Sequence, residues 1–244
     1  MSIQSGEALT ESINGKRYYK FENNKFPSVT TIIGEFSDKE WLKDWRKKVG
    51  EEAAERISTF SANRGSVMHQ MLEYYLEYNG DKSQKLKYTQ DKIVEYVEAE
   101  GYTKREYDIG RGLFNKIYSS GTLDRIKKIL YIEETLYSTK YGGYAGRCDA
   151  IFLNHDNKII ILDFKTSKKE KSHKDIKGYY LQISAYYLAF WERFGRKPNG
   201  GEIWIAIENE IYPQIVEIDD ETIKKCLVVF LNMVKKFHNK YPVA

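Results

Sequence analysis

The sequence has few cysteines and prolines, lacks a long apolar run, and carries no strong excess of one charge. Among its 244 residues are 2 cysteines and 4 prolines. Two thiols cannot supply the four thiolates that a cysteine-ligated iron–sulfur cluster generally needs, so no such cluster is expected. Two cysteines far apart in the chain also indicate a reducing compartment. No apolar run reaches the length of a membrane span, so a membrane partner is not expected.

The first residues, MSIQSGEALTESINGKR, show no sign of a targeting signal. They contain acidic residues and lack the apolar core of a secretory signal. We therefore expect a cytoplasmic protein. Lys and Arg number 39 against 35 Asp and Glu, a net charge of +4. This small excess permits a polyanionic partner but does not demand one.

The stretch 144–167 is the most informative part of the chain, because it predicts two strands joined by a polar turn. We expect the strands at 144–153 and 158–165, since the four residues between them, NHDN, are turn formers. The second strand begins with four aliphatic residues, IIIL at 159–162. Such a run is typical of a strand that is buried on both faces, so this strand is predicted to be central in a sheet.

The charged end of this strand sets a condition on the turn. Asp163 and Lys165 point to the same side, and Asp149 lies near the middle of the first strand. A loop of three or five residues, with Asn154 opposite Lys158, places Asp149 opposite Asp163. A loop of four residues turns Asp149 to the wrong face.

Two interpretations of these charges stay open at this point. Opposed carboxylates about 5 Å apart at Cβ repel each other unless a cation lies between them, and Mg²⁺ binds one or two carboxylates in this way. The alternative is a structural salt bridge between Lys165 and either aspartate at the end of a strand.

Hydrophobic spacing predicts the remaining elements. A hairpin is expected around Asn14–Gly15, and further strands are expected at 129–138, 202–207 and 212–218. Helices are predicted at 38–49, 51–60, 63–78, 89–100, 111–118, 174–193 and 219–238, and none is assigned to 28–36. The 174–193 helix follows a strand and so implies a crossover to another strand of the sheet. The fold class is thus α/β, a central mixed sheet flanked by helices. We expect one domain, with a hairpin and helical part at 1–128 and a sheet core at 129–244.

Several polar residues stand at informative positions on these elements. His69 and Glu73 are four residues apart on one helix, as are Gln182 and Tyr186 on another. A single helical histidine is more often a surface or core residue than a metal ligand. Glu133 and Glu134 are adjacent on a strand and point to opposite faces.

In this order, the motifs resemble the PD-(D/E)XK nuclease superfamily, and within it the RecB-like branch. The resemblance lies in His69 of RGSVMHQMLE, Asp149 of YAGRCDAIF, Asp163 and Lys165 of ILDFKTS, and Gln182 and Tyr186 of LQISAYYLAF. The segments FPSVTTII and WLKDWRKKVG are similar to the N-terminal part of mitochondrial genome maintenance exonucleases and related bacteriophage proteins. The proline of the family's Pro-Asp is absent, and Cys148 stands in its place.

The resemblance implies a restriction-endonuclease-like core with an N-terminal helical elaboration, and a role for each matching residue. Mg²⁺ or Mn²⁺ would be held by His69, Asp149, Asp163 and the carbonyl of Phe164. Lys165 would position or deprotonate the attacking water. Gln182 and Tyr186 would hold the substrate backbone or orient Lys165. Of the two adjacent glutamates, Glu134 is favoured as the one that faces the site. Cys148 is not expected to act as a nucleophile, because it alternates with Asp149.

The function implied is a metal-dependent DNA exonuclease that hydrolyses phosphodiester bonds at single-stranded ends, in DNA replication, recombination or repair. Its compartment would be the cytoplasm of a bacterium or of a phage-infected cell, with replication or recombination proteins as candidate partners. The helices before residue 128 would form a wall or arch over the strand. Two alternatives remain: an endonuclease of the same fold acting on duplex or structured DNA, and a non-catalytic DNA-binding subunit.

Overall fold

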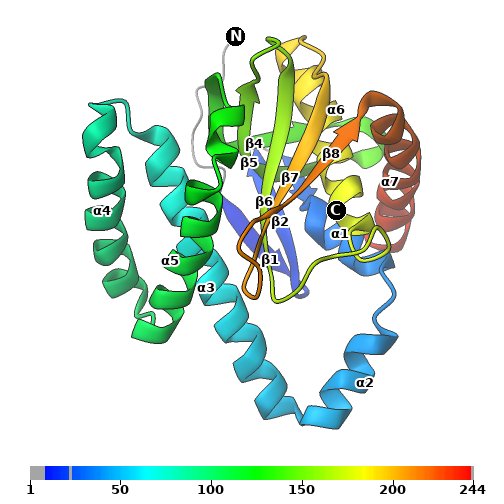
Figure 1. The fold of residues 1–244 in the computed structure, drawn as a ribbon. Coiled ribbons are helices and arrows are strands. Elements are labelled where there is room, and N and C mark those ends of the chain that lie inside the picture. Colours follow the sequence, from blue (N-terminus) through cyan, green and yellow to red (C-terminus); the bar gives the residue numbers. More distant parts are fainter. Residues whose placement is uncertain (1–8, 22–23, 243–244) are drawn as a thin grey trace.

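A computed structural model describes residues 9–21 and 24–242 of the chain (Figure 1). The expectation about a targeting signal concerns in part residues 1–8, which lie outside the described residues. Among the described helices, none is both long and apolar enough to cross a membrane.

A five-stranded mixed sheet forms the centre of the molecule. Its strands are β4 (Lys128–Ser138), β5 (Tyr144–Leu153), β6 (Ile159–Ser167), β7 (Gly200–Ile207) and β8 (Gln214–Asp219), in that spatial order. Neighbours are antiparallel except for β6 and β7, which are parallel and joined through helix α6 (Lys177–Phe194). The predicted mixed sheet, the crossover and the central position of the aliphatic strand are therefore confirmed.

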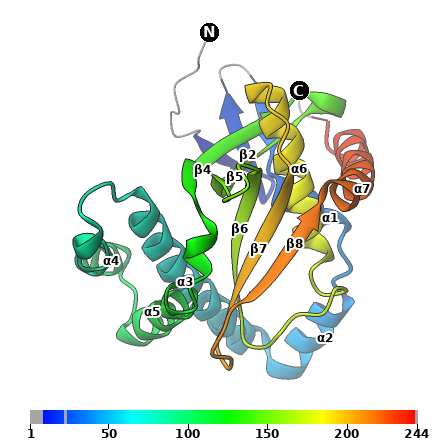
Figure 2. The same cartoon turned by 45° about the horizontal axis from the view of Figure 1, so that its top comes forward.

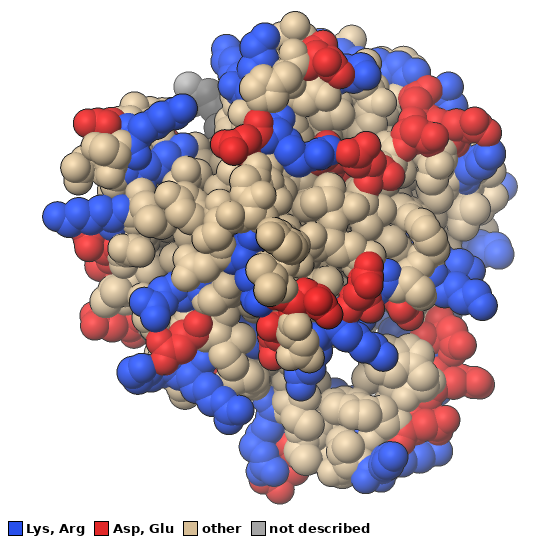
Figure 3. All heavy atoms as spheres, in the orientation of Figure 1, with Lys and Arg blue, Asp and Glu red and all other residues tan. Residues whose placement is uncertain are grey.

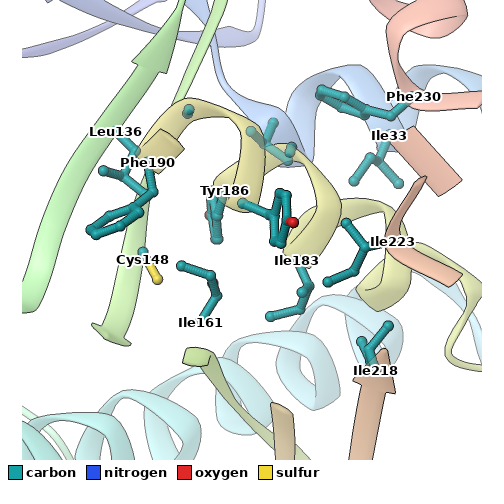
Figure 4. Close-up of a cluster of buried hydrophobic side chains, with 14 of the residues drawn as sticks. Ile33, Leu136, Cys148, Ile161, Ile183, Tyr186, Phe190, Ile218, Ile223 and Phe230 are labelled. Atoms are coloured by element: carbon teal, nitrogen blue, oxygen red, sulfur yellow. The ribbon is translucent and has the colours of Figure 1, made fainter. Parts of the chain in front are cut away.

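Helices cover both faces of this sheet (Figures 1 and 2). One face packs on α3 (Glu51–Glu77), α4 (Lys85–Glu100) and α5 (Lys104–Ser119), and the other on α1 (Val29–Phe36), α6 and α7 (Asp220–Lys240). Side chains of β6 alternate between the two layers: Ile160 and Leu162 face the α3 layer, whereas Ile159 and Ile161 face the α6 layer. Figure 4 shows Ile161 together with Ile183 of α6 in the second layer.

A small antiparallel sheet precedes these helices and contains β1 (Thr10–Ile13), β2 (Lys16–Phe21) and β3 (Asn24–Pro27). Asn14 and Gly15 form the first turn with φ of 51° and 72°, as the Asn-Gly signal predicts. Three short 3₁₀ helices, η1 (Lys82–Gln84), η2 (Thr122–Arg125) and η3 (Lys140–Gly142), complete the described elements.

The helical prediction needs two corrections. Helix α1 was not predicted, although Ser28 caps it by accepting a hydrogen bond from the amide of Thr31 (3.0 Å) and Val29, Ile32 and Ile33 are buried at helical spacing. The helices expected at 51–60 and 63–78 form one continuous helix of 27 residues, because nothing between them breaks it.

Helix α2 (Glu40–Val49) and the first half of α3 extend away from the sheet as an arm (Figure 1). None of the residues of α2 is buried, and Trp41 is 68% exposed. Figure 3 shows an opening between this arm and the rest of the molecule. That these helices form a wall or arch over a DNA strand stays a prediction.

The hairpin between β5 and β6 has the register on which the candidate site depends. Leu153 pairs with Ile159, and the amide of Asn154 donates to the carbonyl of Lys158 (3.0 Å), which encloses a three-residue loop. The Asn154 side chain accepts the Lys158 amide (2.9 Å), and Asn157 adopts a φ of 60°. This is the odd-length loop that a shared site requires.

Removing buried volume from the sheet tests the layer assignment. Ile161 is fully buried beneath α6, so Ile161→Ala should lower the free energy of unfolding by about 2–5 kcal/mol. As a control, Val228→Ala on α7 should change it by less than about 0.5 kcal/mol, since Val228 is 64% exposed. Urea unfolding followed by circular dichroism measures both values. Equal losses for the two variants would contradict the assignment.

Candidate active site

The candidate site lies where the central sheet separates. Strand β6 pairs with β7 as far as Ser167, but its ladder with β5 ends at the Ala150–Leu162 pair. One further step in the same register places Asp149 opposite Asp163. There, Oδ2 of Asp149 accepts the amide of Phe164 (2.6 Å) in place of a regular ladder bond.

A cleft of about 2010 Å³ opens at this separation. Its walls come from α3, the small β1–β3 sheet, β4, β5, β6 and α6. The polar side chains that line it near the separation are His69, Glu73, Glu133, Arg147, Asp149, Asp163, Lys165, Gln182 and Tyr186. The structure thus brings together all the side chains that the sequence motifs had singled out.

His69 reaches this cleft because α3 passes close to β6. At Gly65 a Cβ atom would already lie 3.5 Å from Oγ1 of Thr166. The ring of His69 meets Phe164 edge-on, and its Nδ1 is 3.5 Å from Oδ2 of Asp149. Burial and the positive charge of Lys165 lower the pKa of His69 to about 4. Its imidazole is therefore neutral near pH 7, the form that binds a metal.

Glu133, and not Glu134, is the glutamate that joins His69 and Asp149. The ligand atoms of these three residues lie within 4.8 Å of one another. Glu133 also pairs with Nε of Arg147 (2.5 Å). Glu134, which was expected to face the site, also lines the cleft, but it is buried, pairs with Arg193 of α6 (2.7 Å) and does not belong to this cluster.

A bulge in β4 explains why Glu133, and not Glu134, lies on the same face of the sheet as Asp149. The first pairs of the ladder, such as Ile129–Phe152, would place Glu134 opposite Arg147 on the face of Asp149 if they continued. The register shifts by one residue between Ile129 and Tyr131, so Glu134 pairs with Cys148 instead. Nothing in the sequence marks the bulge.

Glu133 itself has a backbone conformation that is unusual for its residue type. Its φ is 49°, within the left-handed region that costs a side-chain-bearing residue about 1–2 kcal/mol. Strained residues of this kind cluster at functional sites, where the surrounding structure holds them in place. The strain at Glu133 is thus a second sign that this carboxylate has a function.

Asp163 and Lys165 form the second half of the site. Asp163 is almost fully buried, and its carboxylate pairs with the Lys165 ammonium while accepting a hydrogen bond from Nε2 of Gln182 (2.8 Å). Nζ of Lys165 lies 3.3 Å from the carbonyl oxygen of Phe164. Gln182 therefore contacts Asp163, not Lys165.

Tyr186 holds the side chain of Gln182 in place through a hydrogen bond. Its hydroxyl accepts a hydrogen bond from Nε2 of Gln182 (3.1 Å), and its ring packs so closely on Gly146 that an added Cβ would lie 2.7 Å from it. Figure 4 shows Tyr186 in the buried α6 layer. Cys148 lies in the same buried cluster, as its alternation with Asp149 predicts.

Four of the acidic groups that line this cleft are hard to ionise. Burial is the largest cause in every case. It raises the pKa of Glu73 and Asp149, that of Asp163 to about 6, and that of Glu133 to about 8. Repulsion from Asp149 adds to the effect at the other three groups, and at Glu133 it helps to outweigh the attraction of Arg147.

These side chains fit a divalent cation. A cation would offset the crowded negative charge, and a neutral imidazole with carboxylate oxygens is a donor set that suits Mg²⁺ or Mn²⁺. His69, Glu133 and Asp149 are already gathered, whereas Asp163 and the Phe164 carbonyl contact Lys165. Glu73 and Arg147 were not predicted as part of the site. The sequence did contain a signal for each: Glu73 is four residues after His69 on the same helix, and Arg147 is two residues before Asp149 on the same strand.

Comparison with known proteins identifies the family. A model of the PD-(D/E)XK nuclease superfamily matches residues 18–230. The chain belongs to this superfamily. PD-(D/E)XK nucleases use divalent metal ions, in agreement with the carboxylate and histidine cluster of the cleft.

No curated protein matches this PD-(D/E)XK chain. Among solved structures, an Eubacterium rectale protein named "Putative exonuclease" is 13% identical, with a TM-score of 0.49 over 71% of this chain and 68% of the other. A protein named SSO0001 is 16% identical, with a TM-score of 0.34 over 72% of this chain and 90% of the other. Both TM-scores lie below 0.5, so the assignment rests on the family model.

The raised pKa of Glu133 makes the metal-free protein sensitive to pH. Its folded pKa of about 8 exceeds the ordinary value of 4.5, so the folded state binds the extra proton and loses stability as the pH rises toward 8. The lowered pKa of His69 has the opposite effect, because it makes the folded state less stable as the pH falls, but this effect is confined to pH values below its ordinary pKa of 6.5. In EDTA, the melting temperature should therefore fall between about pH 6.5 and 8. Glu133→Gln should flatten this slope and Glu134→Gln should keep it; equal slopes in both variants would contradict the pKa assignment.

The same pair of variants tests which glutamate meets the metal. Glu133→Gln should weaken Mn²⁺ binding in isothermal titration calorimetry by about tenfold or more, because it removes a charged oxygen from the cluster. Glu134→Gln should leave Mn²⁺ affinity within about twofold but destabilise the fold by about 1–3 kcal/mol through its pair with Arg193. The reverse pattern would restore Glu134 as the site residue.

Proposed function

We propose that the protein is a Mg²⁺- or Mn²⁺-dependent DNA exonuclease of the RecB-like branch, which acts on single-stranded ends in DNA replication, recombination or repair. The observation that supports this best is the convergence of His69, Glu133, Asp149, Asp163 and Lys165 in one cleft. A cleft with this set of groups can bind a cation, a phosphate and a water side by side. We infer that both parts of the chain act as one domain, since the family model extends over both.

His69, Glu133 and Asp149 would hold the cation, with Asp163 and the Phe164 carbonyl as further oxygen ligands. When bound, a divalent cation supplies charge stabilisation at the phosphate and lowers the pKa of a water molecule. The Lys165 ammonium has a raised pKa, because the attraction of Asp163 and Asp149 outweighs its burial. It therefore stays charged, and it would offset the charge of the scissile phosphate and orient the attacking water.

Gln182 and Tyr186 are positioning residues in this proposal. Gln182 holds one oxygen of Asp163 while Lys165 holds the other. The Asp163 carboxylate is thus fixed in direction before a substrate arrives, which saves reorganisation in the transition state. Neither Gln182 nor Tyr186 needs to touch the DNA for this role.

The arm of α2 and α3 supports an action on strand ends. The opening between the arm and the body is bounded by chain in Figure 3, so a strand would enter it by a free end. In the last turn of α2, Arg46 pairs with Glu51 and Glu55, whereas Lys47 and Lys48 are exposed and would attract a phosphate backbone. We infer that a single strand enters through this opening on its way to the cleft.

Loss of Lys165 should abolish cleavage. Lys165→Ala should lower the rate of cleavage of an end-labelled linear single strand by at least about 100-fold. The substitution removes the ammonium group that, in this proposal, offsets the charge of the scissile phosphate. The matched control is Lys158→Ala, which removes an exposed lysine of the hairpin loop and should retain wild-type activity. EDTA should abolish cleavage by the wild type.

A circular single strand separates the exonuclease from its alternative. The proposal requires loss of the linear substrate alone, with mononucleotides or short products released from one end. Cutting of the circle would reassign the protein as an endonuclease. Binding without any cleavage of linear, circular or duplex DNA would indicate the non-catalytic role.

A further inference from the structure

One face of the β4–β5 ribbon leads from the candidate metal ligands to a group of aromatic rings. In the register after the bulge, Thr135 pairs with Arg147 and Tyr137 with Ala145, so these side chains follow Glu133 along the cleft face. Tyr137 is four residues beyond Glu133, or roughly 13 Å along the strand. Both line the same cleft.

Phe21, Phe26 and Tyr137 form what we call the aromatic platform. The rings come from β2, β3 and β4, with centroids 4.6 Å apart for Phe21–Tyr137 and 5.8 Å apart for the stacked pair Phe26–Tyr137. Phe26 is buried and its ring is held against Gly143, where a Cβ would lie 2.3 Å away. Phe21 and Tyr137 are only half-buried.

The platform is more than the core of a small sheet. Residues that only filled such a core would be covered on all sides, whereas all three rings of the platform also line the cleft. The buried ring of Phe26 packs against the rings of Phe21 and Tyr137. The half-buried Phe21 and Tyr137 therefore have ring surface that a ligand in the cleft can cover.

Cations border the platform on the same cleft. Arg17 and Lys20 of β2 are exposed there, and Arg147 lies between the platform and the carboxylates. Arg17 is held by a hydrogen bond to Oγ1 of Thr30 (3.1 Å). The acidic Glu192 also lines the cleft, and it is paired with Lys140 (3.1 Å). The cleft thus offers aromatic faces and positive charge at a distance from the metal ligands.

We propose that the aromatic platform is a stacking subsite for an unpaired base of the DNA strand whose phosphate lies at the carboxylates. The inference rests on the proposed nuclease function and deepens it. Aromatic rings interleaved with cations bind the bases and phosphates of single strands with little sequence preference. A paired duplex keeps its base faces stacked within the helix, so the platform selects for single-stranded DNA.

Variants of the platform give the first test. Phe21→Leu and Tyr137→Leu should each weaken binding of a fluorescent (dT)₁₂ in EDTA by about 5- to 30-fold, as measured by anisotropy. The control is Tyr212→Leu, an exposed tyrosine (69%) outside the cleft, which should bind within about twofold of wild type. Wild-type affinity in both platform variants would overturn the proposal.

Abasic substrates test the proposal without altering the protein. A single abasic site is moved along the (dT)₁₂, and wild-type affinity should fall by a similar factor at one or two adjacent positions. At that position Phe21→Leu should cause no further loss, because the stacking partner is already missing. An abasic series that binds uniformly, or wild-type protein that does not bind (dT)₁₂, would overturn the subsite.

The two proposals fail in different ways. If wild type degrades linear strands but abasic sites have no effect, the nuclease function stands and the platform is structural. If abasic sites weaken binding but no substrate is cleaved, the subsite stands and the nuclease function fails.

Discussion

The candidate site depends on the register of a single hairpin. The closing hydrogen bond between Asn154 and Lys158 sets β5 against β6 so that Asp149 approaches Asp163. A slip by one residue would turn Asp149 away, because side chains alternate between the faces of a strand. The ladder then stops, and the two strands separate into the cleft. Hydrogen bonds in a polar loop thus position two carboxylates several residues away.

The cost of this arrangement appears in the electrostatics of the cleft. Four acidic groups share a partly buried space, and burial raises the pKa of each. One of them, Glu133, also has a left-handed backbone. Neither feature stabilises a metal-free fold, and both become useful when a divalent cation and a phosphate enter. The site is thus organised for a ligand at some expense of stability.

Family and function rest on different grounds in this protein. Membership of the PD-(D/E)XK superfamily follows from a match across most of the chain. Our proposal for the substrate is based instead on two other features, the arm of α2 and α3 and the aromatic platform on β2, β3 and β4. A fold can host many activities, so a proposal for a strand end, a duplex or a junction has to be argued from such features and not from the family alone.

Local patterns in the sequence determined much of the fold. The aliphatic run at 159–162 predicted a central strand, and the Asn-Gly pair predicted a hairpin. The spacing of the motifs predicted that Asp163 and Lys165 lie in the site. These signals suffice because burial and turn geometry act on neighbouring residues. Only the tertiary structure decided that Glu133 and not Glu134 joins the cluster of His69 and Asp149, since a bulge in β4 shifts the register between Ile129 and Tyr131. The family resemblance implied that His69 shares a site with Asp149, 80 residues away, and the structure brings the two side chains to 3.5 Å. The structure alone gathered the platform from three strands. Contacts between distant segments depend on how whole layers pack, which no local pattern records.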